Sequence, residues 1–269
     1  MDDDTKEHIK KRFKRILGYE LNLRHPKTIQ EKIQWIKIYG KLERFAKYTD
    51  KAKVRKFIRK RIGNEYLVPV FGVYKRVEDI DFDALPQSFV MKATHGSGWN
   101  IFVKDKSEIN WPKAKSRMKK WLKSNWYDKS MERNYKPLKG RVMIEKFLWD
   151  SSGRIKEYKF QCFHGSRIFL RLPGHSTLRI YNRKGDVIHE RIDKQSFHHP
   201  PEKPKQLEKM FALAHILAKD FPYVRVDFIV ANGRIYVGEL TFATGGGFLP
   251  APKEWSLKLG SLLDLKRYV

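Results

Sequence analysis

Residues 89–103 read Phe-Val-Met-Lys-Ala-Thr-His-Gly-Ser-Gly-Trp-Asn-Ile-Phe-Val. An apolar run ends at Lys92, a short loop with two glycines follows, and a second apolar run begins at Ile101. This order predicts two strands joined by a loop of small residues. Because glycine lets successive backbone N–H groups converge, such a loop can hold an anion, and the lysine adds a positive charge beside it. An ordinary turn gives the same local pattern, so the inference of a phosphate site depends on the rest of the chain.

The composition is that of a globular protein. The chain has 269 residues, of which 41% are hydrophobic, enough for one large domain or two to three smaller lobes with a sizeable core. No apolar run approaches the roughly 20 residues that cross a bilayer, and the acidic start of the sequence is unlike a signal peptide. The single cysteine, Cys162, excludes an intrachain disulfide and is expected to be a buried thiol. These features predict a cytoplasmic protein.

The net charge of +27 is the most unusual global property of the chain. Such a charge attracts polyanions, among them nucleic acid, anionic lipid head groups and acidic polysaccharide, but it does not select between them. A highly charged soluble surface without a polyanionic partner is the alternative. The sequence contains no helix-turn-helix, zinc or RNA-recognition signature, so we expect no specific nucleic acid partner.

Helical patterns dominate the first part of the chain and strand patterns the last part. A basic amphipathic pattern over residues 5–17 predicts a helix that either packs against the body or lies on an anionic membrane surface, and we expect packing. A capping box at residues 28–31 begins a second helix, and Asp50 caps a third. Short apolar strands separated by turns follow residue 141. Helices and strands in blocks predict an α+β fold with antiparallel sheets.

A predicted β-hairpin at residues 224–240 carries two acids in this basic chain. Arg225 and Asp227 alternate with apolar residues, so they share the face away from the core, and Glu239 lies on the return strand. Two neighbouring carboxylates repel each other unless a cation lies between them. All-oxygen ligands suit Mg²⁺, which keeps several waters and accepts one or two protein carboxylates plus phosphate oxygens. A solvated acidic pair is the alternative interpretation of the hairpin alone.

Whether the two acids share a face depends on the turn of the hairpin. A two-residue turn at 232–233 sends Glu239 to the other side of the sheet from Asp227. A three-residue loop at 231–233 pairs Asp227 with Val237 and makes Glu239 a diagonal neighbour on the same face, with Cβ atoms about 7–8 Å apart or less. A shared metal site needs a shared face, so we predict the three-residue loop.

Two further segments carry weaker signals. Lys159 lies inside an apolar strand pattern, so its ammonium must face water, a cleft or an anion. Glu145 ends another strand, and the backbone of residues 146–148 just beyond it can bind the edge of an adenine ring. Asp150 can then accept hydrogen bonds from ribose hydroxyls. Each signal has a plain structural alternative, and only the combination is specific.

These features form an ordered series along the chain. The series consists of Asp50, Lys51, Lys92, the loop His95, Gly96, Ser97 and Gly98, the segment Glu145, Lys146, Phe147 and Leu148, then Lys159, Arg225, Asp227, Glu239, Thr241 and the glycine loop 245–247. It resembles the ATP-grasp fold, and most closely the TupA-like (teichuronopeptide biosynthesis) ATP-grasp family of bacterial surface-glycan gene clusters. The phrases Glu-Tyr-Lys-Phe-Gln-Cys-Phe-His-Gly and Gly-Glu-Leu-Thr-Phe support this resemblance, which covers roughly residues 26–260.

The resemblance implies how the chain holds ATP. Lys51 and Lys92 would reach the nucleotide phosphates, and the loop 95–98 would be a mobile flap over them. Residues 145–148 would form the adenine hinge, and Lys159 would lie near the base and the phosphates. Together with the ribose contact named above, these residues make up the expected nucleotide site.

The resemblance also implies a metal site and a catalytic group. Asp227 and Glu239 would bind Mg²⁺, and Arg225 would lie beside the transferring phosphate. The wider superfamily has asparagine two residues after the metal-binding glutamate, whereas this chain has Thr241. A threonine hydroxyl can still coordinate but reaches less far, which leaves the number of metal ions open. Arg225, with Lys92 and Lys159, is the expected catalytic set.

The implied architecture has three parts. Residues 1–64 would be an N-terminal helical segment, residues 65–140 a first ATP-grasp lobe with the flap, and residues 141–269 a second lobe with the hinge and the metal-binding hairpin. The two α+β lobes with antiparallel sheets would enclose the nucleotide. The loop 244–247, just past the hairpin, would either hold an acceptor oxyanion through backbone N–H groups or be a plain flexible loop.

The resemblance further implies a ligase. ATP would phosphorylate a carboxylate and an amine would attack the acyl phosphate, which attaches an amino acid or amine to an acidic cell-surface polysaccharide or its precursor. This location suggests a cytoplasmic enzyme, with contact at the inner face of an anionic membrane as an open extension. An ATP-grasp kinase acting on a sugar hydroxyl is the nearest alternative. A glycosyltransferase-associated role is another, although no convincing Asp-x-Asp motif is present.

Overall fold

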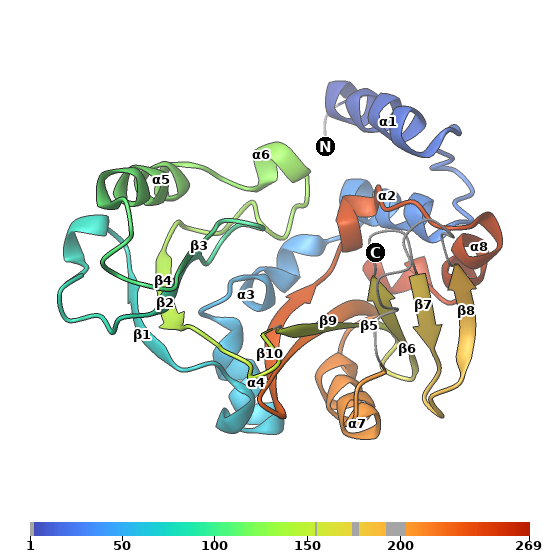
Figure 1. The fold of residues 1–269 in the computed structure, drawn as a ribbon. Helices are drawn as coiled ribbons and strands as arrows, with labels where there is room; N and C mark the ends of the chain where they lie inside the picture. The colour runs from blue at the N-terminus through green and yellow to red at the C-terminus, as the bar shows by residue number, and fades with distance from the viewer. Residues whose placement is uncertain (1–2, 154, 174–177, 192–202) are drawn as a thin grey trace.

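The structure is a computed structural model that describes residues 3–153, 155–173, 178–191 and 203–269 (Figure 1). Two antiparallel sheets form its framework, one with the strand order β1-β4-β2-β3 and the other with the order β10-β9-β5-β6-β7-β8. The predicted α+β fold with antiparallel sheets is therefore confirmed. The strands are β1 (Val70–Tyr74), β2 (Phe89–Ala93), β3 (Asn100–Val103), β4 (Val142–Lys146), β5 (Lys156–Phe163), β6 (Arg167–Pro173), β7 (Leu178–Tyr181), β8 (Val187–Arg191), β9 (Tyr223–Ala231) and β10 (Arg234–Thr241).

Helices cover and connect the two sheets. The α-helices in the described part of the chain are α1 (Asp3–Leu17), α2 (Ile29–Tyr39), α3 (Ala46–Thr49), α4 (Val54–Ile62), α5 (Trp111–Lys123), α6 (Tyr127–Ser130), α7 (Leu207–Ala218) and α8 (Lys253–Ser261). In Figure 1, α3 and α4 lie between the sheets, α5 lies over the four-stranded sheet and α7 lies under the six-stranded one. Within the described ranges, no helix combines the length and apolar character needed to cross a membrane.

The four-stranded sheet contains residues 89–103, the stretch with the two-glycine loop. Strands β2 and β3 pair as a hairpin around residues 94–99, as predicted, with Lys92 opposite Asn100. Met91 and Phe89 are fully buried and pack with Met118 of α5 in one apolar cluster. The core on this side therefore holds the end of β2 rigidly, which fixes where Lys92 projects.

Strand β4 belongs to the first sheet. The predicted division at residues 140 and 141 assigns this strand to the second lobe, yet it pairs with both β1 and β2. Apolar residues at both central positions, Met143 and Ile144, are buried between these neighbours. We propose to divide the two lobes after Lys146, where the chain leaves the first sheet and goes on to β5.

The six-stranded sheet has one apolar face and one polar face near its centre. Phe160 of β5 and Phe228 of β9 contact each other and are fully buried, and Phe160 also packs on Phe211 of α7. Alternation along the strands turns the residues between them to the opposite face. Cys162 lies in the same apolar layer, and burial raises the pKa of its thiol, as expected of a structural cysteine.

The N-terminal segment packs on the body of the protein. Helix α1 buries Ile9 and Phe13 completely, in a cluster with Ile38 and Phe248, so the predicted packing of this helix is confirmed. Helix α2 begins with the predicted capping box, in which the Thr28 hydroxyl and the glutamate three residues later satisfy each other's backbone N–H groups. These helices thus cover the loop that follows the hairpin of β9 and β10.

Candidate active site

The hairpin of β9 and β10 has a two-residue turn. Arg234 pairs directly with Ala231, and both Asn232 and Gly233 have positive φ angles, of 47° and 73°. Such a turn matches the twist of the flanking strands, and Asn-Gly is its preferred sequence. The predicted three-residue loop is therefore wrong. Asn-Gly strongly favours a two-residue turn, and the prediction had chosen the longer loop only because it keeps Asp227 and Glu239 on one face.

A β-bulge in β10 returns Glu239 to the face of Asp227, from which the two-residue turn alone would have removed it. The pairing shifts between Val237, which lies opposite Phe228, and Glu239, which lies directly opposite Asp227. Gly238 is the extra residue, so the side chains beyond it change faces once more. The two acids are consequently direct cross-strand neighbours on one face, which is closer than the diagonal arrangement that the sequence predicted.

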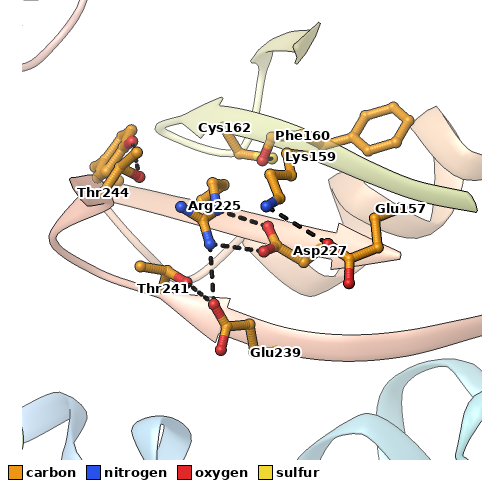
Figure 2. Close-up of polar contacts among 10 residues, drawn as sticks. Glu157, Lys159, Phe160, Cys162, Arg225, Asp227, Glu239, Thr241 and Thr244 are labelled. Carbon is orange, nitrogen blue, oxygen red and sulfur yellow. Dashed lines mark hydrogen bonds and ion pairs between the residues drawn. The ribbon is translucent and has the colours of Figure 1, made fainter. Parts of the chain in front are cut away.

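Polar side chains form two rows across the centre of the sheet. Lys159 pairs with Asp227, which in turn pairs with Glu239. The next row places Arg225 between Gln161 and Thr241. Figure 2 shows all of these residues except Gln161 close together, with the arginine directed toward both acids.

Arg225 bridges the two acids (Figure 2). Its Nε and Nη2 atoms donate to the two carboxylate oxygens of Asp227, each at 2.6 Å, and Nη2 also donates to Glu239 Oε1 at 2.9 Å. The Thr241 hydroxyl donates to the same Glu239 oxygen at 2.9 Å. Lys159 lies alongside, 3.5 Å from a carboxylate oxygen of Glu157.

The two acids differ in their electrostatic surroundings. Burial raises the pKa of Asp227 to about 6, although Arg225 opposes this effect. Burial also acts to raise the pKa of Glu239, but Lys51 and then Arg225 outweigh it and the pKa is lowered. For Arg225, burial is opposed and outweighed by both acids, so its pKa is raised. A further cation near Asp227 would therefore stabilise its charged form.

The donor set fits a hard divalent cation that has other ligands as well. Asp227, Glu239 and Thr241 supply only oxygen atoms, which is the preference of Mg²⁺. In the portions of the chain that the structure describes, no group of three or more His, Cys, Asp or Glu side chains forms a complete metal site. Two carboxylates leave coordination positions for phosphate oxygens and water, as a metal–nucleotide complex requires.

Lys51 lies between the flap and the hairpin. Its backbone N–H donates to Thr94 O at 3.0 Å, and its ammonium donates to the carbonyl of Gly96. Asp50 holds this turn in place through two hydrogen bonds from Arg141, at 2.9 and 2.8 Å. Burial lowers the pKa of Lys51, and Glu239 is the strongest opposing influence. The lysine is thus a cation from the helical segment within electrostatic range of Glu239.

Lys92 and Glu145 form an ion pair on the first sheet. Their strands are adjacent, and the side chains are 17% and 7% exposed. Both line a small cavity of about 20 Å³ between the sheets, together with Lys51 and apolar residues such as Val68 and Val237. A volume of this order holds about one water molecule, so the cavity shows where the charged and apolar groups meet and not a preformed base site.

The predicted flap has an anchored start. The His95 ring is buried, its Nε2 atom lies 2.8 Å from the Trp121 carbonyl, and it packs against Trp99. A Cβ atom on Gly96 would lie 2.4 Å from the Trp99 ring, so this glycine is needed for close packing. Ser97 is half-buried and Gly98 is exposed with a φ of 70°. Only the tip of the loop therefore faces solvent.

The predicted hinge continues from β4 over the hairpin. The Lys146 side chain is exposed, while its backbone N–H donates to Pro69 O at 2.9 Å. Phe147 is half-buried, and Leu148 packs on the cluster around Tyr236. The backbone here is held next to the cavity described above.

Asp150 has another partner in this structure. Its carboxylate accepts hydrogen bonds from the backbone N–H groups of Ser152, at 2.9 Å, and Asn232, at 2.6 Å. These bonds fasten the turn after the hinge to the tip of the hairpin. The side chain is therefore not brought together with the other predicted site residues, and the local Asp-Ser-Ser-Gly turn pattern was the signal for this role.

Several charged groups near the hairpin were not predicted. Arg171 of β6 pairs with Lys159 in the sheet, and its pKa is lowered by burial and further by Arg225. Lys37 of α2 and Glu132, which follows α6, are almost completely buried close to the glycine loop Thr244–Gly247. An arginine between apolar strand residues was a usable signal, whereas Lys37 and Glu132 lie in ordinary helix and loop patterns.

Comparison with known proteins identifies the family of the chain. The family model for TupA-like ATPgrasp matches residues 31–264. The chain belongs to the TupA-like ATP-grasp family. This membership confirms the family that the sequence motifs predicted, and with it the ATP-grasp fold. No curated protein matches the chain.

Solved structures with similar folds include two D-alanine–D-alanine ligases. The enzyme from Bacillus anthracis is 20% identical, with a TM-score of 0.43, over 80% of this chain and 62% of that chain. The Helicobacter pylori enzyme is 15% identical, with a TM-score of 0.47, over 87% of this chain and 69% of that one. N5-carboxyaminoimidazole ribonucleotide synthetase from Thermus thermophilus is 12% identical, with a TM-score of 0.38, over 72% and 45%. The TupA-like chain thus spans less than two thirds of the first of these ligases.

Proposed function

We propose that this TupA-like protein is an ATP- and Mg²⁺-dependent ligase that joins a carboxylate to an amine through an acyl phosphate. The observation that carries the proposal is the row of Lys159, Asp227 and Glu239 with Arg225 beside it, across β5 and the adjacent β9–β10 hairpin of an ATP-grasp fold. Two carboxylates with an arginine and lysines around them suit the transfer of a phosphoryl group between anionic oxygens.

Each charged residue has a role in this proposal. Asp227 and Glu239, with Thr241 beside them, would hold Mg²⁺, which neutralises charge on the phosphates. Lys51 and Lys92 would bind the phosphates from the side of the flap. Arg225 lies within hydrogen-bond distance of both acids, so it is positioned to stabilise the oxyanion that develops on the carboxylate substrate.

An acidic glycan is the proposed source of the carboxylate. The net charge of +27 favours a polyanionic substrate. A basic groove with a volume of about 820 Å³ adds a local binding surface, lined by Lys47, Tyr48, Lys53, Lys56, Phe57, Lys60 and Arg61. Aromatic rings beside cations suit sugar rings that carry carboxylates. Contact with anionic membrane surfaces would use the same charge, but the glycan also explains the aromatic lining.

Hydroxamate formation tests the reaction class. The purified protein is incubated with ATP, Mg²⁺, hydroxylamine and, in turn, glucuronate, galacturonate and N-acetylmuramate as sugar acids. Hydroxylamine converts an acyl phosphate to a hydroxamate, which is detected as its ferric complex. The ligase proposal predicts hydroxamate and ADP in equal amounts with at least one acid. ADP release that depends on a sugar hydroxyl, without hydroxamate, would instead support the kinase.

A further inference from the structure

A buried carboxylate lies beside the glycine loop that follows the metal hairpin. Glu132 comes from the connection between α6 and β4 and is only 7% exposed. A Cβ atom placed on Gly246 would lie 3.8 Å from Oε1 of Glu132, so the carboxylate is in direct contact range of the loop. The first lobe therefore contributes an acid to a region otherwise built from the second lobe and α2.

Glu132 lies in the field of the hairpin charges. Burial raises its pKa to about 7, Lys37 and Arg225 act in the opposite direction, and Glu239 raises it further. The neighbouring Tyr135 is influenced by the same carboxylates and by Arg225. Glu132 is therefore within electrostatic range of Arg225 and Glu239 as well as next to Gly246.

No cation neutralises this carboxylate by direct contact. Within the described residues, Glu132 forms no ion pair with any ammonium or guanidinium group. The Ser130 side chain forms a hydrogen bond with the carboxylate, and its oxygen also accepts a hydrogen bond from the Glu132 backbone N–H at 3.1 Å. An almost fully buried carboxylate without a cation is costly, which suggests that a positively charged partner joins it during function.

Lys37, the nearest candidate partner, is committed elsewhere. Its ammonium donates to the Gly246 carbonyl at 3.0 Å and lies over the Phe248 ring, 4.8 Å from its centre. Gln34 donates to the same carbonyl at 2.9 Å. Lys37 therefore fixes the loop. Arg12 of α1 also lies over the Phe248 ring, 4.5 Å from its centre, and its charge lowers the pKa of Lys37.

We propose that Glu132 binds the ammonium group of the amine co-substrate and accepts the proton that it must lose. This inference rests on the proposed ligase function. An alkylammonium ion is not a nucleophile, so Glu132 takes one proton and frees the nitrogen lone pair. The nitrogen then forms a bond to the acyl carbon, the carbon–oxygen bond to phosphate breaks, and the second proton leaves with phosphate as hydrogen phosphate. The amide, hydrogen phosphate and neutral Glu132 balance the step.

Comparison of two nucleophiles tests this role. Hydroxylamine is uncharged at neutral pH and needs no base, whereas ammonium chloride supplies a nitrogen that must be deprotonated. With the sugar acid selected by the hydroxamate assay, Glu132→Gln should form hydroxamate within about twofold of the wild-type rate. With ammonium at pH 7 it should lose about 10²-fold or more, the usual contribution of a general base. The loss should shrink about tenfold per pH unit as free ammonia replaces ammonium.

Matched variants separate this role from a structural one. Arg133, the residue after Glu132, forms an ion pair with Glu43, with 2.5 Å between Arg133 Nε and Glu43 Oε1. Glu43→Gln removes this ion pair, so it loosens the same connection without altering the buried acid. It should leave both rates unchanged. If Glu132→Gln lowers both rates equally, the residue only supports the fold; if it lowers neither, another group is the base. Absence of hydroxamate with the wild-type protein would instead refute the ligase itself.

Discussion

Replacing Lys92 by methionine should destabilise the protein in the absence of ATP. The change leaves Glu145, which is 7% exposed, buried without the cation that pairs with it. Removing one partner of a buried ion pair costs about 3–5 kcal/mol, and the 17% exposure of the lysine places this site at about 3 kcal/mol. For a protein of this size such a loss lowers the Tm by roughly 6–12 °C.

A double-mutant cycle measures the pair itself. Glu145→Met leaves the more exposed lysine unpaired and should cost less than Lys92→Met. The double variant K92M/E145M removes both charges and should recover most of the loss, with a coupling of about 2 kcal/mol or more in urea unfolding. If the losses of unfolding free energy in the two single variants sum to that of the double variant within about 0.5 kcal/mol, the ion pair does not hold the two strands together.

The same variants test phosphate binding. ATP–Mg²⁺ at 100 times its Kd should stabilise the wild-type protein by about 2.7 kcal/mol. Both variants that lack Lys92 should lose most of this gain, even though the double variant is nearly as stable as the wild type. Full stabilisation of K92M/E145M by ATP would refute the assignment of Lys92 to the phosphates.

Three further changes have defined outcomes. Asp227→Ala or Glu239→Ala should reduce ATP turnover at least about 10³-fold, since each removes a metal ligand; near-normal turnover, measured by ADP release, would overturn the metal assignment. Glu132→Gln should change how stability depends on pH. The folded pKa of about 7 lies above the ordinary 4.5, so the wild type loses stability as the pH rises from 4.5 to 7, by about 3 kcal/mol, and the variant should lack this loss in urea titrations. Reversing two charges of the basic groove in K56E/K60E should raise the KM for an acidic glycan several-fold and weaken its salt dependence; a variant with two lysines of α5 reversed should behave as the wild type.

The sequence predicted which residues belong to the candidate site, but it predicted only in part on which face of the sheet each of them lies. Alternation in residues 224–230 correctly placed Arg225 and Asp227 on one face. The position of Glu239 depended on a bulge, and a glycine in a strand is equally consistent with a flat strand. The Asp-Ser-Ser-Gly pattern at residues 150–153 indicated a turn in which Asp150 accepts backbone hydrogen bonds. A ribose contact was predicted instead, because Asp150 lies close in sequence to the predicted adenine hinge.

Interactions between segments far apart in sequence could not be predicted. Strand β4 joins the first sheet because its neighbours β1 and β2 offer free edges, which is a property of the assembled fold. Lys37 and Glu132 meet at the glycine loop across 95 positions of sequence and carry no local signature of their burial. A single acid after a short helix is ordinarily exposed to solvent. Only the folded structure shows that Glu132 is buried and forms no ion pair with a described residue.

The charges of the site are matched except at the points where the reaction would bring in a cation. Glu145 has Lys92, and Arg225 contacts both acids of the hairpin. The raised pKa of Asp227 indicates that one arginine does not fully compensate two buried carboxylates, which is the deficit that a divalent metal would fill. The raised pKa of Glu132, beside the glycine loop, shows that Lys37 likewise does not fully compensate this acid, and a single ammonium would suffice there. Under the two proposals, a metal with phosphate would bind at the acid pair and an amine at the lone acid, which is the distribution of charge that an acyl-phosphate ligase requires.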